Sequence, residues 1–272
     1  MNNLYREVAP INERAWSDIE KEAARTLKRY LAGRLVVDVK GPDGVALSAV
    51  GTGHLRNVAP PAEGVIARQH EVKALVELRV PFQLDRQAID DVERGANDSN
   101  WQPLKDAAKT IAFAEDRIIF DGYAAASVEG IRTGSSNPAM TLPQEVAHYP
   151  SAIAQALGQL RLVGVNGPYS VLLGADAYTA LSEASDHGYP VINHIQRLVN
   201  DEIVWAPAVS GALVLSKRGG DFVLHLGQDL SIGYLGHTDR VVSLYLQETL
   251  TFLMLTAEAS VAIVPAQKGR TE

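Results

Sequence analysis

Residues 51–83 constrain the fold more than any other part of the 272-residue chain. Polar and apolar residues alternate over much of this stretch, and Pro60-Pro61 interrupts it near the middle. Alternation with a period of two around a proline turn predicts two paired β-strands. A ribbon of two strands is only marginally stable alone. We therefore expect a long arm that packs on something else, a neighbouring subunit being one candidate.

Composition narrows the class of protein. Hydrophobic residues make up 46% of the chain, enough for one large core or two smaller ones. The net charge of -7 argues against nucleic acid as the main partner. The absence of cysteine excludes disulfides, thiolate metal sites and a cysteine nucleophile. No apolar signal region or membrane-length run is present, so we expect a soluble cytoplasmic protein, with export lacking a signal peptide left open.

Apolar residues recur at helical spacing in two regions. Residues 12–32 predict a helix with Asn12 as N-cap, an apolar face ending near Tyr30 and Leu31, and Gly33 as the stop. That face packs either on the chain's own core or on a partner. Residues 84–126 predict a short helix that ends at Gly95, followed by a long helix capped by Asp98 or Ser99.

The remaining chain predicts strands and mixed α/β structure. We expect strands at 34–39 and 45–50, and loops at 132–149. The segment 150–234 alternates helices with strands. The glycines in RGGD, residues 218–221, predict a hairpin between 212–217 and 222–227. Two strands are expected in 240–264 and a disordered end in 265–272.

Neither a catalytic nor a metal site assembles from the sequence. The serine, aspartate and first histidine of SDHGYPVINHI, residues 185–195, are adjacent, whereas a catalytic triad must converge in space. The two histidines of this stretch are seven residues apart, which fits no short metal motif. Glu145 and His148 have the spacing of a di-iron ligand pair, but the motif occurs once. We predict no catalytic residue, no metal site and no enzyme.

Carboxylates cluster in AIDDVERG and FAEDRIIFDG. Paired acids can act in general acid–base catalysis when their environments separate their pKa values. Arg86, Arg94 and Arg117 lie among these acids. We therefore favour ion pairs on the surfaces of helices.

Several blocks, taken together and in order, resemble the encapsulins, the bacterial nanocompartment shell proteins, and particularly their actinobacterial members. The similarity runs from about residue 1 to residue 263. It is carried by NNLYREVAPINERAW, GRLVVDVKGP, IDDVERG, GPYSVLL, DHGYP, RGGDFVLHLGQDLSIGY and LYLQETLTF.

The resemblance implies an α+β fold of the HK97-type phage major capsid protein. Its P-domain would include the N-terminal helix and arm at 1–48, the helices at 84–139 and the C-terminal strands at 226–264. The extended E-loop would be residues 49–83, the A-domain residues 140–225 and the disordered tail residues 265–272. Partners would be further copies of the chain in an icosahedral shell of sixty subunits, the T=1 form. When a heterologous interface repeats with the right rotation, the assembly closes and no interface surface is left exposed.

The resemblance also assigns the stretch SDHGYPVINHI to the loop that lines the fivefold pore. Candidates for the pore rim are Asp186, His187, Gly188 and Tyr189. A ring of histidines could change charge between pH 5 and 8. The alternative is that His187 only packs the loop.

A second site implied by the resemblance is a groove between the N-terminal helix and the P-domain that binds the C-terminal targeting peptide of a cargo protein. Relatives enclose a dye-decolorizing peroxidase, and some a ferritin-like protein. Carried over by position, the groove comprises Leu27, Tyr30, Leu31, Arg34, Val36, Asp38, Leu230, Ile232 and Tyr234. Apolar peptide side chains would fill it, with Arg34 and Asp38 as polar ends.

Gln87 departs from the family pattern. Some encapsulins bind flavin against a tryptophan in the block that matches FQLDRQAIDD, where this chain has Gln87 and no aromatic face. We expect no cofactor. Two other functions stay open: a phage or prophage capsid protein with the same fold, and a secreted bacteriocin or protease.

Overall fold

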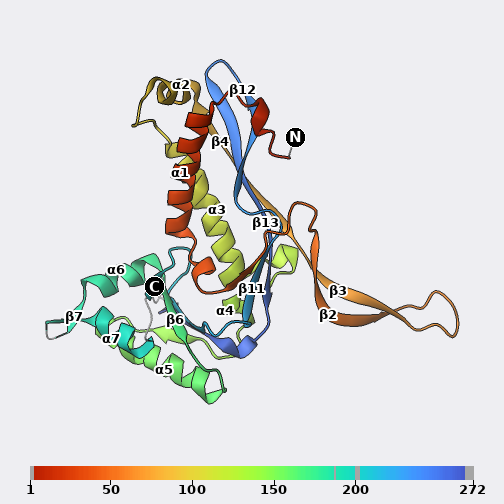
Figure 1. Cartoon of the computed structure of the whole chain (residues 1–272). Coiled ribbons are helices and arrows are strands. Elements are labelled where there is room, and N and C mark those ends of the chain that lie inside the picture. Colours follow the sequence, from red (N-terminus) through yellow and green to blue (C-terminus); the bar gives the residue numbers. More distant parts are fainter. Residues whose placement is uncertain (1–2, 187, 200–202, 267–272) are drawn as a thin grey trace, which may run out of the picture.

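A computed structural model describes residues 3–186, 188–199 and 203–266 (Figure 1). The helices are α1 Glu13–Tyr30, α2 Arg86–Arg94, α3 Gln102–Asp121, α4 Ile131–Gly134, α5 Tyr149–Leu162, α6 Ala175–Glu183 and α7 Val191–Val199. The strands are β1 Asp38–Lys40, β2 Ala49–Val58, β3 Ala67–Ala74, β4 Val76–Asp85, β5 Met140–Leu142, β6 Tyr169–Leu173, β7 Ser185–Asp186, β8 Tyr189–Pro190, β9 Ile203–Trp205, β10 Ala212–Ser216, β11 Phe222–Leu226, β12 Ser231–His237, β13 Val241–Met254 and β14 Ser260–Pro265.

Two five-stranded sheets organise the chain, which confirms the α+β class. In the first sheet the order is β1-β11-β13-β12, and β4 also pairs with the long strand β13. The second sheet has the order β5-β14-β10-β6-β9. The hairpin predicted for β10 and β11 is wrong, because the two strands belong to different sheets: β10 pairs with β6 and β14, and β11 with β1 and β13. The RGGD turn carries the chain from one sheet to the other.

The predicted arm is present as the ribbon β2–β3, which extends away from the rest of the molecule (Figure 1). The prediction is wrong for residues 76–83, since β4 leaves the ribbon and pairs with β13 over ten residues. The ribbon exposes apolar side chains, including Ile66 with 86% of its surface accessible and Val72 with 56%. At its base, Lys73 Nζ donates a hydrogen bond of 2.8 Å to the Ser127 carbonyl.

The predicted helices form, with corrections at their ends. Asn12 caps α1 by accepting a hydrogen bond from the Ala15 amide (2.8 Å), as predicted. The stop at Gly33 is wrong: α1 ends at Tyr30, and Gly33 starts a short 3-10 turn, Gly33–Leu35, where a Cβ atom would lie 2.5 Å from Ile119 Cδ1. Close packing therefore explains the glycine. That turn also replaces most of the strand predicted at 34–39, of which only the end is β1.

α2 ends at Gly95, whose φ of +108° is the left-handed conformation expected of a stop. The cap predicted for α3 is wrong. The helix begins after Trp101 without a side-chain cap, and Ser99 Oγ instead donates to the Ala88 carbonyl (3.1 Å). The loops predicted at 132–149 contain α4's end and β5.

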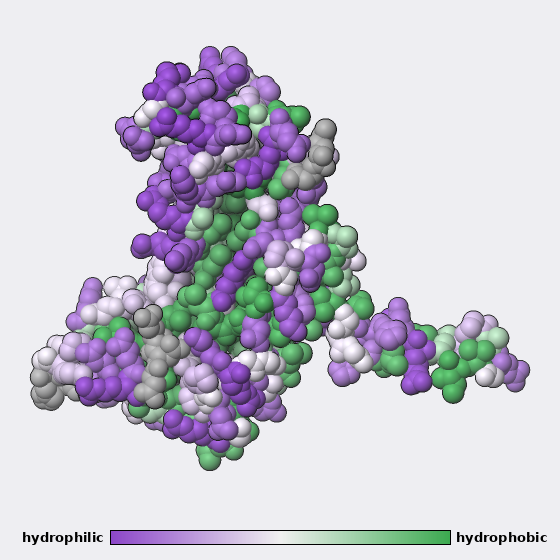
Figure 2. Space-filling model, viewed as in Figure 1, coloured by the Kyte–Doolittle hydropathy of each residue, from purple (hydrophilic) through white to green (hydrophobic). Residues whose placement is uncertain are grey.

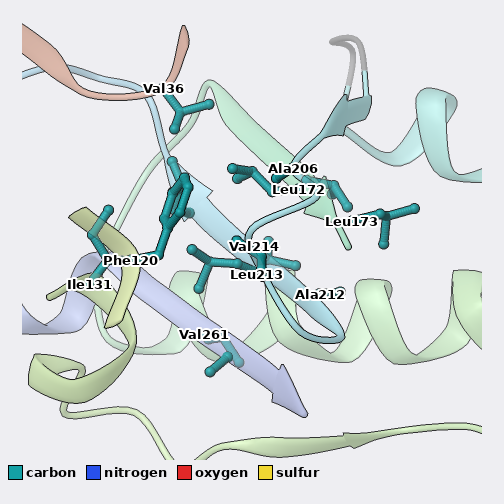
Figure 3. Packing of buried hydrophobic residues seen from close by; sticks show 14 of the residues in the cluster. Val36, Phe120, Ile131, Leu172, Leu173, Ala206, Ala212, Leu213, Val214 and Val261 are labelled. Carbon is teal, nitrogen blue, oxygen red and sulfur yellow. The ribbon is translucent and has the colours of Figure 1, made fainter. Parts of the chain in front are cut away.

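Two hydrophobic clusters make the core. The first surrounds the second sheet, whose strands β6 and β10 are buried at every position (Figure 3). The second lies between α1, α2 and α3 on one side and β4, β12 and β13 on the other. The helix α3 takes part in both clusters, with Leu104 to Ala112 in the second and Ile118 to Phe120 in the first.

Candidate partner-binding face

The residues predicted to bind a cargo peptide divide into two groups. Six of the nine belong to the second hydrophobic cluster or pack against it: Leu27, Tyr30, Leu31, Leu230, Ile232 and Tyr234. Leu27 and Ile232 are buried, with 8% and 5% of their surface accessible, whereas the other four are half-buried. We call these six residues the apolar slot. Figure 2 shows hydrophobic surface along the middle of the molecule beside α1.

The six residues of the apolar slot come from two parts of the chain, the end of α1 and the segment that leads into β12. Asn12 starts α1 so that Leu27 and Leu31, four residues apart, point to one flank. Tyr30 is fixed by Phe113 of α3, with ring centroids 5.6 Å apart, and by Trp205 of β9 at 5.7 Å. In β12, the Tyr234 backbone N–H donates a hydrogen bond to the Leu4 carbonyl (2.8 Å), which ties the N-terminal segment to this strand.

Val36 and Asp38 do not join the apolar slot. Val36 is buried in the first hydrophobic cluster. The Asp38 carboxylate accepts a hydrogen bond of 2.6 Å from the Gly220 amide, so it fixes the turn between β10 and β11. A small hollow of about 90 Å³ lies beside both residues.

Arg34 is the centre of a charge cluster rather than a free polar end. Its guanidinium donates to both carboxylate oxygens of Glu115 (2.6–3.0 Å) and to Asp229 Oδ1 (2.8 Å). It also reaches Glu248 Oε2 at 3.2 Å. Burial would lower the pKa of Arg34, but hydrogen bonds and charges from Glu115 and Asp229 raise it overall. The cation is therefore permanent and fully engaged.

The carboxyl groups of this cluster sit in unusual environments. Burial raises the pKa of Glu248 well above its usual value, and the neighbouring charge of Glu115 adds to this. Glu248 Oε1 has no hydrogen-bond partner among the described residues. Burial also raises the pKa of Asp116 from 3.8 to about 7, although that carboxylate accepts hydrogen bonds from the Gly33 and Ala32 amides (2.8 and 3.1 Å). The raised pKa of Glu248 favours its neutral form, which reduces the excess of negative charge in the cluster.

This cluster was not predicted from the sequence. The acids of FAEDRIIFDG were expected to form ion pairs on a helix surface, yet Glu115 and Asp116 are fully buried and only Arg117 beside them is exposed. The surface interpretation is confirmed for Arg94, which pairs with Asp91. A detectable signal was Glu248, the one Asp, Glu, Lys or Arg residue in the 14 residues of β13, because a buried charge is almost always paired.

The predicted pore loop is a tight hairpin formed by β7 and β8, with Gly188 at φ +83°. The Tyr189 ring packs edge-on against His194 (5.0 Å between centroids), and the Arg197 guanidinium lies over it at 5.2 Å. His187 and the side chain of Asp186 lie outside the described residues.

The structure also locates the other candidates. Glu145 and His148 are exposed, and 3.7 Å separate Glu145 Oε2 from His148 Nδ1. No group of three or more potential metal ligands occurs within the described residues. The Gln87 backbone N–H donates a hydrogen bond to Asp85 Oδ1 (2.9 Å), and its side-chain Nε2 donates one to Asp91 Oδ1 (3.3 Å). Gln87 lies beside a hollow of about 500 Å³. No described helix has the length and apolar character needed to cross a membrane.

Comparison with solved structures identifies the fold. A virus-like particle from Pyrococcus furiosus aligns with a TM-score of 0.67 at 11% sequence identity, covering 91% of this chain and 98% of the other. Mycobacterium phage Bobi aligns with a TM-score of 0.56 at 13% identity, covering 87% and 91%. Two sheets, a projecting ribbon and these alignments define a protein of the HK97-type capsid fold, as predicted.

Sequence comparison identifies the family. A family model described as "Encapsulating protein for peroxidase" matches residues 1–251. The type 1 encapsulin shell protein of Mycobacterium tuberculosis is 62% identical over 263 residues, covering 97% of this chain and 99% of the relative. That of Brevibacterium linens is 57% identical, covering 97% and 99%. The chain belongs to the encapsulin family, which confirms the resemblance seen in the sequence.

Proposed function

We propose that this chain assembles into a closed icosahedral shell, sixty subunits in the T=1 form, that encloses a partner enzyme. The projecting ribbon supports self-assembly, because its exposed apolar residues need a covering surface that the same subunit does not supply. Membership in a family described as encapsulating a peroxidase supports the enclosed partner. The partner is a dye-decolorizing peroxidase or, as the second candidate, a ferritin-like protein.

The apolar slot is proposed to bind the C-terminal targeting peptide of that partner. The observation that carries this proposal is that Leu31, Leu230 and Tyr234 are all half-buried and pack against the same hydrophobic cluster, to which α1 also contributes. Half-buried apolar side chains can still lose water-exposed surface to a peptide. A flexible peptide loses entropy on binding, so a single slot binds weakly, and closure of the shell retains the cargo.

A matched pair of variants tests the slot. Leu230→Asp places a charge in the slot, whereas Leu235→Asp places the same charge on β12 at a residue that is already 53% exposed. Both chains are co-expressed with a fluorescent protein that carries a leucine- and isoleucine-rich C-terminal tail. Shells are then isolated by size exclusion, checked by negative-stain microscopy and assayed for fluorescence. Loss of fluorescence with Leu230→Asp alone supports the slot, and equal loading in both variants refutes it.

Asp186, His187, Gly188 and Tyr189 are proposed to line the fivefold pore, through which small substrates reach the enzyme. Five copies of His187 would gain charge as the pH falls through the histidine range. The flux of a small anionic solute into shells, measured from pH 5 to 8, should then depend on pH in wild type and not in His187→Asn. Identical profiles would remove the histidine ring from the proposal.

A further inference from the structure

A groove runs along the side of α1 that packs on α3, and Tyr30 at its end also belongs to the apolar slot. The two helices run in the same direction: Trp101 Nε1 donates to Asp18 Oδ2 (2.8 Å) at one end, and Tyr30 meets Phe113 at the other. Between these contacts lie two hollows of about 360 and 450 Å³, which share Glu22, Arg25 and Lys105. We call this groove the α1–α3 crease. It differs from the apolar slot in being mainly polar.

The crease concentrates positive charge on a chain whose net charge is -7. Its walls carry five cations: Lys21, Arg25, Arg29, Lys105 and Lys109. They also carry three carboxylates, each already hydrogen-bonded within the crease: Asp18 to Trp101, Glu22 to Arg25 and Asp106 to Gln102. Among the described residues, Arg25 alone of the five cations pairs with a carboxylate. Four cations are thus available to an incoming anion.

The cations are regularly spaced. Lys21, Arg25 and Arg29 follow each other at four-residue steps, so they stand about 6 Å apart along α1. Lys105 and Lys109 form a second column on α3 with the same step. Alternate side chains of an extended peptide are about 6.6 Å apart. An extended segment with an acid at every second position can therefore place successive carboxylates opposite Lys105 and Lys109. Arg29, which unlike Arg25 pairs with no carboxylate among the described residues, can bind a further carboxylate with two parallel hydrogen bonds.

The aromatic residues of the crease favour a peptide over nucleic acid. Single-stranded nucleic acids stack their bases on open aromatic faces. Here the Arg29 guanidinium lies over the Trp205 ring at 5.5 Å, and Lys109 Nζ lies 5.6 Å from the centre of the Tyr30 ring. The rings are thus already used by the cations themselves. A net surplus of two positive charges is also small for a phosphate backbone.

We infer that the α1–α3 crease binds an extended acidic segment of the enclosed partner. This inference rests on the proposed function. Leu27 and Arg29 are two residues apart, so they project about 160° apart on α1, and the slot and the crease flank the same helix. A helix with its side chains is about 10 Å across. The acidic segment must then lie at least about three extended residues from the apolar tail.

The experiment uses assembled shells and a monomeric fluorescent protein with three different C-terminal tails. One tail is rich in leucine and isoleucine, one is Glu-Ser-Glu-Ser-Glu-Ser-Glu, and one replaces each glutamate by glutamine. Each reporter is co-expressed with wild type or with Arg29→Gln/Lys105→Gln/Lys109→Gln. The matched control, Lys28→Gln/Lys40→Gln/Arg117→Gln, removes the same charge from exposed residues outside the crease. Reporters per shell are counted by fluorescence, and nuclease-protected RNA by its absorbance after extraction.

We expect wild-type and control shells to enclose about ten times more of the glutamate-tailed than of the glutamine-tailed reporter, a difference of about 1.4 kcal/mol. The crease variant should remove that ratio while enclosing the apolar-tailed reporter as wild type does. If wild-type shells load the apolar tail but enclose the two polar tails equally, the proposed binding of an acidic segment in the crease is wrong, while the proposed function stands. Loss of protected RNA in the crease variant, without a change in the ratio, overturns the acidic peptide as occupant. Failure to load the apolar tail contradicts the proposed function instead.

Discussion

Replacing Arg34 with methionine should destabilise the subunit severely. The substitution removes the cation that holds Glu115, Asp229 and Glu248 together, while methionine keeps the approximate length of the side chain. The Glu115 and Glu248 side chains are completely inaccessible to solvent. Removing one partner of a buried ion pair costs about 3–5 kcal/mol, because a buried charge remains without compensation. Typical domains have only about 5–15 kcal/mol of stability in total.

The measurement is guanidinium unfolding of assembled shells at one fixed protomer concentration, because assembly and folding are linked. The control is Arg94→Met, which removes a surface pair with Asp91 whose contribution should be about 0–1 kcal/mol. A double variant, Arg34→Met/Glu115→Gln, removes most of the uncompensated charge, so it should recover part of the stability lost in Arg34→Met. A coupling free energy of 0.5 kcal/mol or more would be the sign of direct interaction.

An Arg34→Met shell that unfolds at the same guanidinium concentration as wild type would refute this reasoning, because the cluster would then contribute nothing to stability. If that shell also failed to load an apolar-tailed reporter, Arg34 would have the role first predicted for it, a polar end of the peptide groove.

Substitutions at Asp116, Gly122 and Ile66 test three other features of the structure. The pKa of Asp116 is higher in the folded chain than in the unfolded chain, so its contribution to stability is complete below about pH 4 and is lost as the pH rises through about 7. A difference of about three pKa units corresponds to roughly 4 kcal/mol. The free energy of unfolding of Asp116→Asn, measured from pH 4 to 8, should therefore lack the decline seen in wild type. Gly122→Ala should cost at least about 1–3 kcal/mol in thermal or chemical unfolding, because φ is +82° and the new Cβ would lie 2.7 Å from the Gly130 amide nitrogen. Ile66→Asp should leave the helical circular dichroism intact but shift the chain from shells to small species in size exclusion, and normal shells would contradict the role of the ribbon in assembly.

Elements with local signals could be predicted from the sequence. Asn12 as the cap of α1 and Gly95 as the end of α2 depend on a few neighbouring residues, and both are confirmed. The same holds for the ribbon β2–β3, whose alternation and proline turn lie within one stretch of chain. Local hydrogen bonding determines these features, so distant residues had little influence on them.

Pairing between distant segments could not be predicted in this way. The Arg218–Asp221 ion pair within RGGD is compatible with a hairpin, yet β11 pairs in parallel with β1, from Asp38 opposite Val223 onward. Nothing in the two strands or their turn specifies which sheet each one joins. The charge cluster had the same difficulty, because Glu115, Asp229 and Glu248 are far apart in the sequence and meet only in the folded chain.

The position of the charge cluster connects stability to assembly. On α3, Glu115 and Asp116 stand between the residues that enter the second hydrophobic cluster and those that enter the first. Apolar contacts are non-directional and are satisfied by many relative placements of two cores. The hydrogen bonds from Arg34 to α3, to β13 and to Asp229 are directional. All of them can form together only when the two hydrophobic clusters have one particular position relative to each other. A shell closes only if each subunit meets its neighbours at the correct rotation. An internal error in one subunit would be repeated in every copy, so polar bonds at this junction suit a protein whose function depends on closure.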